Sequence, residues 1–172
     1  MKGRLNMEEK RLCCSFTGHR KIKPEHSSKM PDMLTRAINY AYSEGCRDFF
    51  SGGAVGFDTL AAREVIRFRI SHPDVRLVML LPCVSQDEKW SPAQRNAYSY
   101  VLKNADEVIY VSEDYTPDCM RRRNLVLAER ADIMVSYVSY SKSGSAQTEN
   151  MAKRLEKRVY NLYPALEREC NL

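Results

Sequence analysis

The stretch Ser51-Gly52-Gly53-Ala54-Val55-Gly56-Phe57-Asp58 decides the fold. It follows a short strand-like run at 48–51 and precedes a stretch whose apolar residues share one helical face. A glycine turn between a strand and a helix is typical of an anion site, because it presents backbone N–H groups and the positive helix end together. The spacing matches neither Gly-x-Gly-x-x-Gly nor a Walker A loop, and an ordinary tight turn is the alternative interpretation.

Two more glycine turns follow apolar runs. Thr17-Gly18-His19-Arg20 comes after a predicted strand at 11–17, and Ser143-Gly144-Ser145-Ala146-Gln147-Thr148 opens the last long predicted helix. The carboxyl ends of parallel strands meet at one edge of a sheet, which is where open α/β sheets bind ligands. We therefore expect the three turns to converge on one nucleotide-type ligand.

Strands and helices alternate along the chain with short connections. We predict strands at 11–17, 48–51, 75–81, 107–112 and 133–138, an edge strand at 159–163, and helices at 31–44, 58–71, 92–104, 118–130 and 145–157. This alternation predicts a three-layer α/β/α Rossmann-like fold with a mostly parallel, doubly wound sheet. Residues 1–10 are expected to form a disordered or poorly ordered arm, 11–164 a single domain and 165–172 a tail.

Composition narrows the class of protein. The chain has 172 residues, of which 44% are hydrophobic and 28% charged, and its net charge of +5 is compatible with a phosphate-bearing ligand or nucleic acid. It contains no run of 18 apolar residues and no apolar signal core in residues 1–10, so we expect a cytoplasmic protein without membrane association. The six cysteines include no Cys-x-x-Cys pair, which favours reduced thiols over a metal site.

Several side chains near the turns are candidate ligand contacts. Arg20 suits bidentate phosphate binding, and Asp58 suits either a ribose hydroxyl or a helix cap. Trp90 suits stacking on a ligand ring or packing within its own domain. The full set of predicted ligand- or phosphate-binding residues is Gly18, His19, Arg20, Ser51, Gly52, Gly53, Gly56, Asp58, Trp90, Arg123, Asn124, Gly144, Ser145 and Thr148. No nucleophile–base pair and no metal site is predicted, and a nucleotide-type ligand is the only cofactor indicated.

The order of these motifs resembles that of the SLOG superfamily, which includes DprA and the LOG phosphoribohydrolases. The resemblance rests on Ser-Gly-Gly-Ala-x-Gly-x-Asp, on Arg123-Asn124 and on Ser-Gly-Ser-x-x-Thr, and it covers residues 11–163. The opening Thr-Gly-His-Arg and the Trp90 loop are most similar to the YpsA-like branch. The resemblance implies a Rossmann-like domain that binds a nucleotide or nucleotide-derived ligand, and it implies a homo-oligomer.

The LOG motifs are matched only in part. Arg123 falls on the Arg of the LOG segment Met-x-x-Arg-Lys, but Asn124 replaces its Lys and Met151 takes the place of the Glu in the following loop. A thioether cannot transfer a proton, and Glu149 should point roughly 200° around the helix from that position. We therefore expect a binding module, a sensor or regulator, rather than an enzyme.

Two alternatives stay open at this point. A hydrolase of nucleotide N-glycosidic bonds would need Asp58, Asp87, Glu88 or Glu149 as its acid or base. A DprA-like binder of single-stranded nucleic acid would use the run Arg121-Arg122-Arg123 together with Tyr137 and Tyr140.

Overall fold

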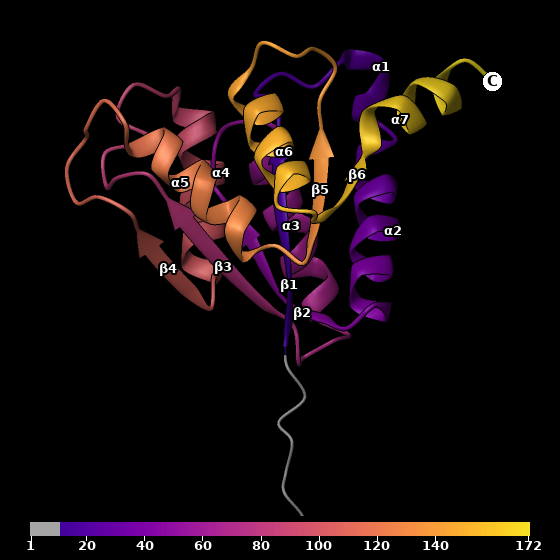
Figure 1. Cartoon of the computed structure of the whole chain (residues 1–172), viewed down its shortest axis with the longest axis horizontal. Helices are drawn as coiled ribbons and strands as arrows, with labels where there is room; N and C mark the ends of the chain where they lie inside the picture. Colours follow the sequence, from indigo (N-terminus) through magenta and orange to yellow (C-terminus); the bar gives the residue numbers. More distant parts are fainter. Residues whose placement is uncertain (1–10) are drawn as a thin grey trace, which may run out of the picture.

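The structure is a computed structural model that describes residues 11–172, so the predicted arm at 1–10 lies outside the described residues. Six parallel strands form one sheet in the order β4-β3-β2-β1-β5-β6 (Figure 1). The strands are β1 (Leu12–Gly18), β2 (Cys46–Ser51), β3 (Arg76–Leu81), β4 (Glu107–Tyr110), β5 (Ile133–Tyr137) and β6 (Arg158–Asn161). The predicted doubly wound α/β fold is confirmed, with β6 as an edge strand.

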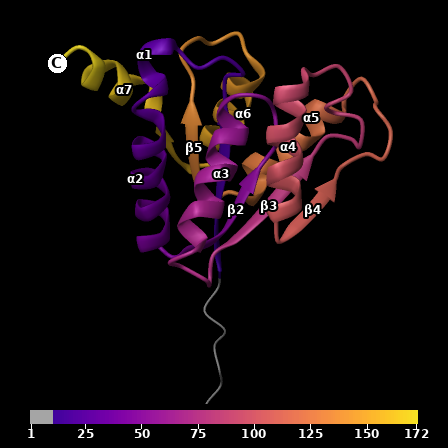
Figure 2. The ribbon, with the colours of Figure 1, turned by 180° about the vertical axis from the view of Figure 1, so that it is seen from behind.

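Helices cover both faces of the sheet. Helices α5 and α6 lie on the face turned toward the viewer in Figure 1, and α2, α3 and α4 lie on the face seen in Figure 2, where α7 packs beside α2. The helices are α1 (Pro24–Ser27), α2 (Met30–Ser43), α3 (Phe57–Arg69), α4 (Pro92–Asn104), α5 (Cys119–Arg130), α6 (Gly144–Arg154) and α7 (Leu162–Cys170). None of these helices has the length and apolar character needed to span a bilayer.

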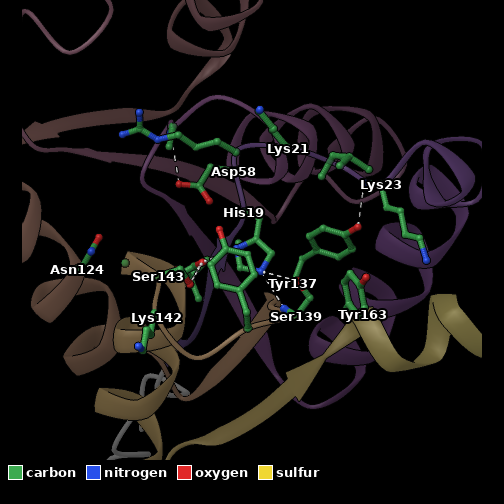
Figure 3. A pocket seen from close by; sticks show the side chains of 18 of the residues that line it. His19, Lys21, Lys23, Asp58, Asn124, Tyr137, Ser139, Lys142, Ser143 and Tyr163 are labelled. Atoms are coloured by element: carbon green, nitrogen blue, oxygen red, sulfur yellow. Dashed lines mark hydrogen bonds between the residues drawn. The ribbon is translucent and has the colours of Figure 1, made fainter.

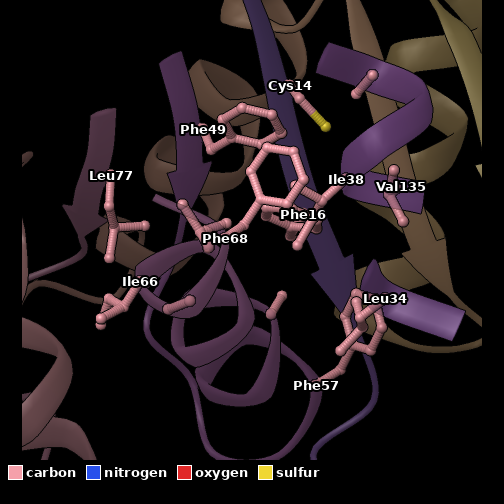
Figure 4. Close-up of a cluster of buried hydrophobic side chains, with 14 of the residues drawn as sticks. Cys14, Phe16, Leu34, Ile38, Phe49, Phe57, Ile66, Phe68, Leu77 and Val135 are labelled. Carbon is pink, nitrogen blue, oxygen red and sulfur yellow. The ribbon is translucent and has the colours of Figure 1, made fainter. Parts of the chain in front are cut away.

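The main core lies between the sheet and the layer of α2 and α3. Phe16 of β1 stacks on Phe49 of β2 with ring centres 6.2 Å apart, and Leu34 and Ile38 of α2 are fully buried (Figure 4). The neighbouring Ser15 points to the opposite face, where its hydroxyl donates to the Leu127 carbonyl of α5. Because β1 is buried on both faces, its sequence contains no charged residue, and its polar side chains are the small Ser15 and Thr17.

Most predicted elements are present with small shifts of their ends. The predicted start of α4 is confirmed, since Ser91 and Gln94 form a reciprocal capping box and Pro92 follows the cap. The predicted tail is wrong, because residues 162–170 form α7 with Leu166 fully buried. Pro164 does not stop regular structure at this point. It is the third residue of α7, within the first helical turn, where a backbone N–H would make no intrahelical hydrogen bond.

The topology sets one special position in the sheet. The chain runs from β1 outward through β2 and β3 to β4, and then returns to place β5 and β6 on the other side of β1. Connections leave β1 and β5 in opposite directions, which opens a crevice at their carboxyl ends. The loops that follow these two strands lie together at one end of the molecule (Figure 1).

Candidate functional site

A cavity of about 1060 Å³ occupies the crevice between the ends of β1 and β5. Its walls are residues 17–24, the β5–α6 connection, the first turns of α5, and Tyr163 of α7 (Figure 3). Ala54 of the β2–α3 connection and Asp58 of the first turn of α3 also line it. Its volume is at the upper end of the range for small-molecule pockets, so it has room for a nucleotide or a larger derivative.

His19 ties the two main loops of the cavity together. Its Nε2 atom accepts a hydrogen bond from the Ser139 backbone N–H at 2.8 Å, so this nitrogen is unprotonated. The proton is therefore on Nδ1, which lies 3.2 Å from the Ser145 hydroxyl oxygen of α6. Burial lowers the pKa of His19 and keeps the imidazole neutral. Both ring nitrogens make hydrogen bonds, so His19 connects the loop after β1 to the loop after β5.

Asp58 is the only carboxylate among the described residues that line the cavity. Its Oδ2 accepts from the Ala54 backbone N–H at 3.3 Å, whereas its Oδ1 is buried and makes no hydrogen bond of normal geometry. Burial raises the pKa of Asp58 to about 6, against the opposing effects of Arg123, the Ala54 N–H, Arg20 and the nearby Gly18 N–H. Asp58 does not cap α3, whose N-terminus has no side-chain cap in the described structure.

Arg123 is a buried cation next to this carboxylate. One of its terminal nitrogens donates to the Gly52 carbonyl, and Nε donates to the Asn124 side-chain oxygen at 2.8 Å. Burial lowers the pKa of Arg123, and the charge of Asp58 opposes this shift. Arg123 thus clamps the glycine loop after β2 onto α5 while its charge stabilises ionised Asp58.

The N-terminus of α6 also borders the cavity. Ser143 caps it by accepting from the Ala146 N–H at 3.1 Å, and Gly144 has ample space around it. The N–H groups of Gly144 and Ser145 are the first two of the helix and have no intrahelical acceptor, so this end is suited to an anion. Lys142 precedes it, and Arg20 and Lys21 are exposed cations of the opposite loop.

The glycines after β2 act mainly through packing. Gly52 and Gly53 are buried and do not line the cavity; a side chain at Gly52 would meet the Arg123 guanidinium 2.5 Å away. Gly56 has a φ of 88° and lies against the Arg20 backbone, so it fixes where the β1 loop runs. Ser51 also lies behind the cavity and donates its hydroxyl hydrogen to the Asp58 carbonyl at 2.9 Å.

Two further predicted contacts lie elsewhere. Trp90 does not line the cavity; it packs against the core with its ring 5.1 Å from that of Tyr98. Thr148 is fully buried, and its hydroxyl donates to the Gly144 carbonyl one turn earlier. The structure therefore brings together Gly18, His19, Arg20, Asp58, Arg123, Asn124, Gly144 and Ser145 around one cavity, and it leaves Ser51, Gly52, Gly53, Gly56, Trp90 and Thr148 behind or away from it.

The acid candidates other than Asp58 lie outside the cavity. Glu149 is buried under α6, where it accepts from Ser136 and pairs with Lys153 at 2.7 Å. Met151 packs into the small apolar cluster around Ala128 and Met134, and Asp87 pairs with the exposed Arg95 at 3.3 Å. Hydrolysis of an N-glycosidic bond would therefore depend on Asp58 alone.

Sequence reasoning did not single out part of the cavity wall. Lys21, Lys23 and Lys142 line it, as do Ser139 and Tyr163. Lys21 and Lys142 each lie one residue from a quoted motif, so extending the motifs would have found them. Tyr163 comes from α7, whose position against β5 no local pattern predicts.

A comparison with protein-family models shows to which family the chain is related. The YpsA model, described as the YspA SLOG family, matches residues 17–165. The chain belongs to this family. The predicted resemblance to the SLOG superfamily, and to its YpsA-like branch, is therefore confirmed.

Two groups of curated Bacillus proteins are similar to this YspA SLOG family member. The SPbeta prophage-derived protein YoqJ of Bacillus subtilis, which bears the description "uncharacterized", is 26% identical over 88% of this chain and 93% of its own length. A UPF0398 protein of Bacillus cereus is 25% identical over 76% of this chain and 73% of its own length. These names identify no ligand.

Solved structures share the fold of this family member. DprA of Streptococcus pneumoniae aligns with a TM-score of 0.63 at 16% identity, covering 94% of this chain and 55% of that one. DprA of Helicobacter pylori, described for its single-stranded DNA binding mode, aligns with a TM-score of 0.61 at 19% identity, covering 86% and 63%. The molybdenum cofactor carrier protein of Chlamydomonas reinhardtii aligns at 0.53 and 13% identity, covering 92% and 82%.

Proposed function

We propose that this protein binds a nucleotide or nucleotide-derived ligand in the cavity between β1 and β5, as a sensor or regulatory module. The observation that carries the proposal is the buried Asp58 Oδ1. It makes no hydrogen bond of normal geometry with the described residues, and Asp58 lines a cavity whose other charged side chains are all cations. An unpaired buried acceptor costs stability unless a ligand donor reaches it. A ribose hydroxyl is a donor of the right kind.

The phosphate end is assigned to the part of the cavity at the N-terminus of α6. The open N-terminus of α6 with Gly144 and Ser145 supplies backbone donors, and Lys142 and Arg20 supply charge. Lys23 is a weaker candidate because it already pairs with Glu167 at 2.6 Å. The polarity of the cavity thus suits a ligand with a hydroxylated sugar at Asp58 and a phosphate at α6.

A thermal-shift screen tests this proposal. The panel holds AMP, ADP, ATP, NAD, ADP-ribose, cyclic nucleotides and a short oligo-dT. A ligand at 100 times its Kd adds about 2.7 kcal/mol of stability, which raises Tm by roughly 5–10 °C for a chain of this length. Arg20→Ala should weaken binding by about 1.5–3 kcal/mol and so remove about half or more of the shift.

The matched control for Arg20→Ala is Arg130→Ala. Arg130 is an exposed arginine at the far end of α5 from the cavity, so its loss should leave the ligand shift intact. Equal ligand shifts in Arg20→Ala and wild type would contradict a phosphate contact at Arg20. No shift with any compound would contradict binding of this ligand class.

Binding of single-stranded nucleic acid is the second candidate. It is favoured by the exposed Lys21, Lys142 and Tyr140 at the cavity mouth and by the fold shared with a DprA described as binding single-stranded DNA. Several phosphate contacts would release several counterions, so the oligo-dT affinity would then fall steeply with salt. For a mononucleotide in the cavity we expect a shallow salt dependence, measured by titration between 50 and about 200 mM salt.

A further inference from the structure

Three tyrosines line the cavity, and they differ in whether a ring face is free. Tyr137 is 1% exposed, stacks on Phe57 at 5.7 Å and uses its hydroxyl to contact His26 and the Lys23 N–H. Tyr163 is half-buried, with its ring centre 5.0 Å from His26 and 5.1 Å from Tyr137. Tyr140 is 58% exposed, so it is the cavity tyrosine with an open face.

The ring of Tyr140 is also held in place. It stacks on the His19 imidazole with ring centres 4.3 Å apart and planes 7° from parallel. His19 cannot turn freely, because Ser139 and Ser145 bond its two nitrogens. One face of Tyr140 is therefore covered by a fixed neutral ring while the other is open to solvent, which reduces the ordering needed when a second ring stacks there.

We propose that the His19–Tyr140 pair is the base-stacking subsite for the ligand, so that a nucleobase lies on the open face of Tyr140. This inference rests on the proposed function and names the chemical class of the ligand as a nucleoside phosphate rather than a sugar phosphate. It assigns to Tyr140 the ring contact expected of Trp90, which points into the core instead. Aromatic stacking suits any base, since every base presents a π face.

The subsite lies within reach of the phosphate end. The His19 imidazole covers the inner face of Tyr140 with ring centres 4.3 Å apart, and its Nδ1 lies 3.2 Å from the Ser145 hydroxyl, so only the two stacked rings lie between the open face of Tyr140 and the N-terminus of α6. Figure 3 shows His19 and Ser139 in the middle of the site, with Asp58 to one side and Ser143 close by. A single free tyrosine face in the cavity accommodates one base, which favours a nucleoside phosphate over a strand whose successive bases each need a surface.

The test compares ligands with and without a base. Binding of AMP, GMP, CMP, UMP and ribose 5-phosphate is measured by calorimetry for wild type, Tyr140→Ala, Tyr140→Phe and Tyr115→Ala. We expect Tyr140→Ala to raise the Kd of the tightest nucleotide roughly 5- to 150-fold while leaving ribose 5-phosphate binding nearly unchanged. Tyr140→Phe keeps the ring and should bind like wild type. Tyr115 is a 65% exposed tyrosine outside the cavity and serves as the matched control.

The outcomes separate this inference from the proposed function. If wild type binds a nucleotide and Tyr140→Ala binds it with the same preference over ribose 5-phosphate, the stacking subsite is refuted and the binding function stands. If wild type binds neither these five compounds nor any nucleotide of the thermal-shift panel, both are refuted. A thermal melt of each variant checks folding, and the exposure of Tyr140 predicts little change in Tm.

Discussion

Asp58 combines two properties that a purely structural carboxylate rarely has. It is almost fully buried, and one of its oxygens makes no hydrogen bond of normal geometry in the described structure. Burial disfavours its charged form more than the neighbouring Arg123 favours it, which leaves the pKa raised to about 6. A folded chain that keeps such a group is less stable near neutral pH than it would be without it, and a donor from a ligand would recover that free energy.

The raised pKa predicts a particular dependence of stability on pH. The folded pKa of about 6 lies above the ordinary value of 3.8, so between pH 4 and 6 the folded state binds more protons than the unfolded state. The free energy of unfolding should therefore fall as pH rises through this window, by about 3 kcal/mol from this group. Asp58→Asn should remove that contribution.

Urea denaturation of wild type and Asp58→Asn at several pH values from 4 to 7 measures the effect. Asparagine brings its own constant change in stability, so the informative quantity is how the difference between the two proteins varies with pH. We expect Asp58→Asn to gain about 3 kcal/mol relative to wild type between pH 4 and 7. Parallel pH profiles would show that Asp58 ionises normally in the folded protein.

At the level of single residues, the sequence patterns predicted which residues lie near the cavity better than they predicted the hydrogen bonds and packing contacts of those residues. The turn after β1 suggested that His19 and Arg20 border a site, and both line the cavity. The sequence offered no means to see that His19 bonds Ser139 and Ser145, because these contacts span more than 110 residues. Trp90 shows the same limit, since an aromatic residue in a polar loop packs on whichever surface the tertiary fold brings near.

Among the elements, the β2–α3 connection shows how glycines place a site without touching it. Gly56 adopts a φ of 88°, which side-chain-bearing residues rarely adopt, and its α-carbon faces the Arg20 backbone. The Phe57 N–H donates to the His19 carbonyl at 3.2 Å, so the same contact joins the two loops. The position of Arg20 at the cavity therefore depends on a glycine in another loop.

Gly56→Ala should both destabilise the protein and weaken ligand binding. The added methyl group would overlap the Arg20 carbonyl, and backbone cannot yield as a flexible side chain can. Gly45→Ala is the matched control, because Gly45 also has a positive φ, of 105°, but has only ordinary contacts. We expect each change to cost about 1 kcal/mol for the strained φ, and Gly56→Ala to cost about 1–3 kcal/mol more.

Urea denaturation and the nucleotide thermal shift of both variants check this prediction. Only Gly56→Ala should lose most of the thermal shift, since only it displaces Arg20. If the two variants show equal stability and equal ligand shifts, the close approach of Gly56 to Arg20 has no energetic importance.

The order of strands and helices was predictable because strand and helix periodicities alternate clearly along the sequence. The exact ends of these elements, and the elements they pack against, were harder to predict. β2 begins at Cys46, two residues before the predicted start, because pairing with β1 extends it past the point where its own apolar run begins. Helix α1 is a single turn within a predicted loop, and its His26 is fully buried through contacts with β5 and α7. Such contacts depend on tertiary structure that a local window does not contain.

At the scale of the whole molecule, α7 packs against the core and forms part of the cavity wall. Leu162 and Leu166 join the main core, and Glu167 pairs with Lys23 at 2.6 Å. The buried His26 Nε2 lies 2.8 Å from the same carboxylate, an ion-pair separation, although its N–H direction is poor for a hydrogen bond. Helix α7 thus fixes the loop that contains Lys23 and supplies Tyr163 to the cavity.

A chain that ends at residue 164, the domain boundary expected from the sequence, should therefore be destabilised and bind ligand poorly. Leu166→Ala provides the milder variant and should cost about 2–5 kcal/mol, the range for removing a fully buried leucine side chain. Leu125→Ala removes a 42% exposed leucine from α5 and should change stability by no more than about 0.5 kcal/mol. Urea denaturation compares the three variants with wild type.

If the chain ending at residue 164 unfolded at the same urea concentration with the same m-value, α7 would contribute nothing to the stability of the fold. A lower midpoint together with loss of the nucleotide thermal shift would make it part of both the fold and the site, because the residues it would release, Lys23 and Tyr163, face the cavity.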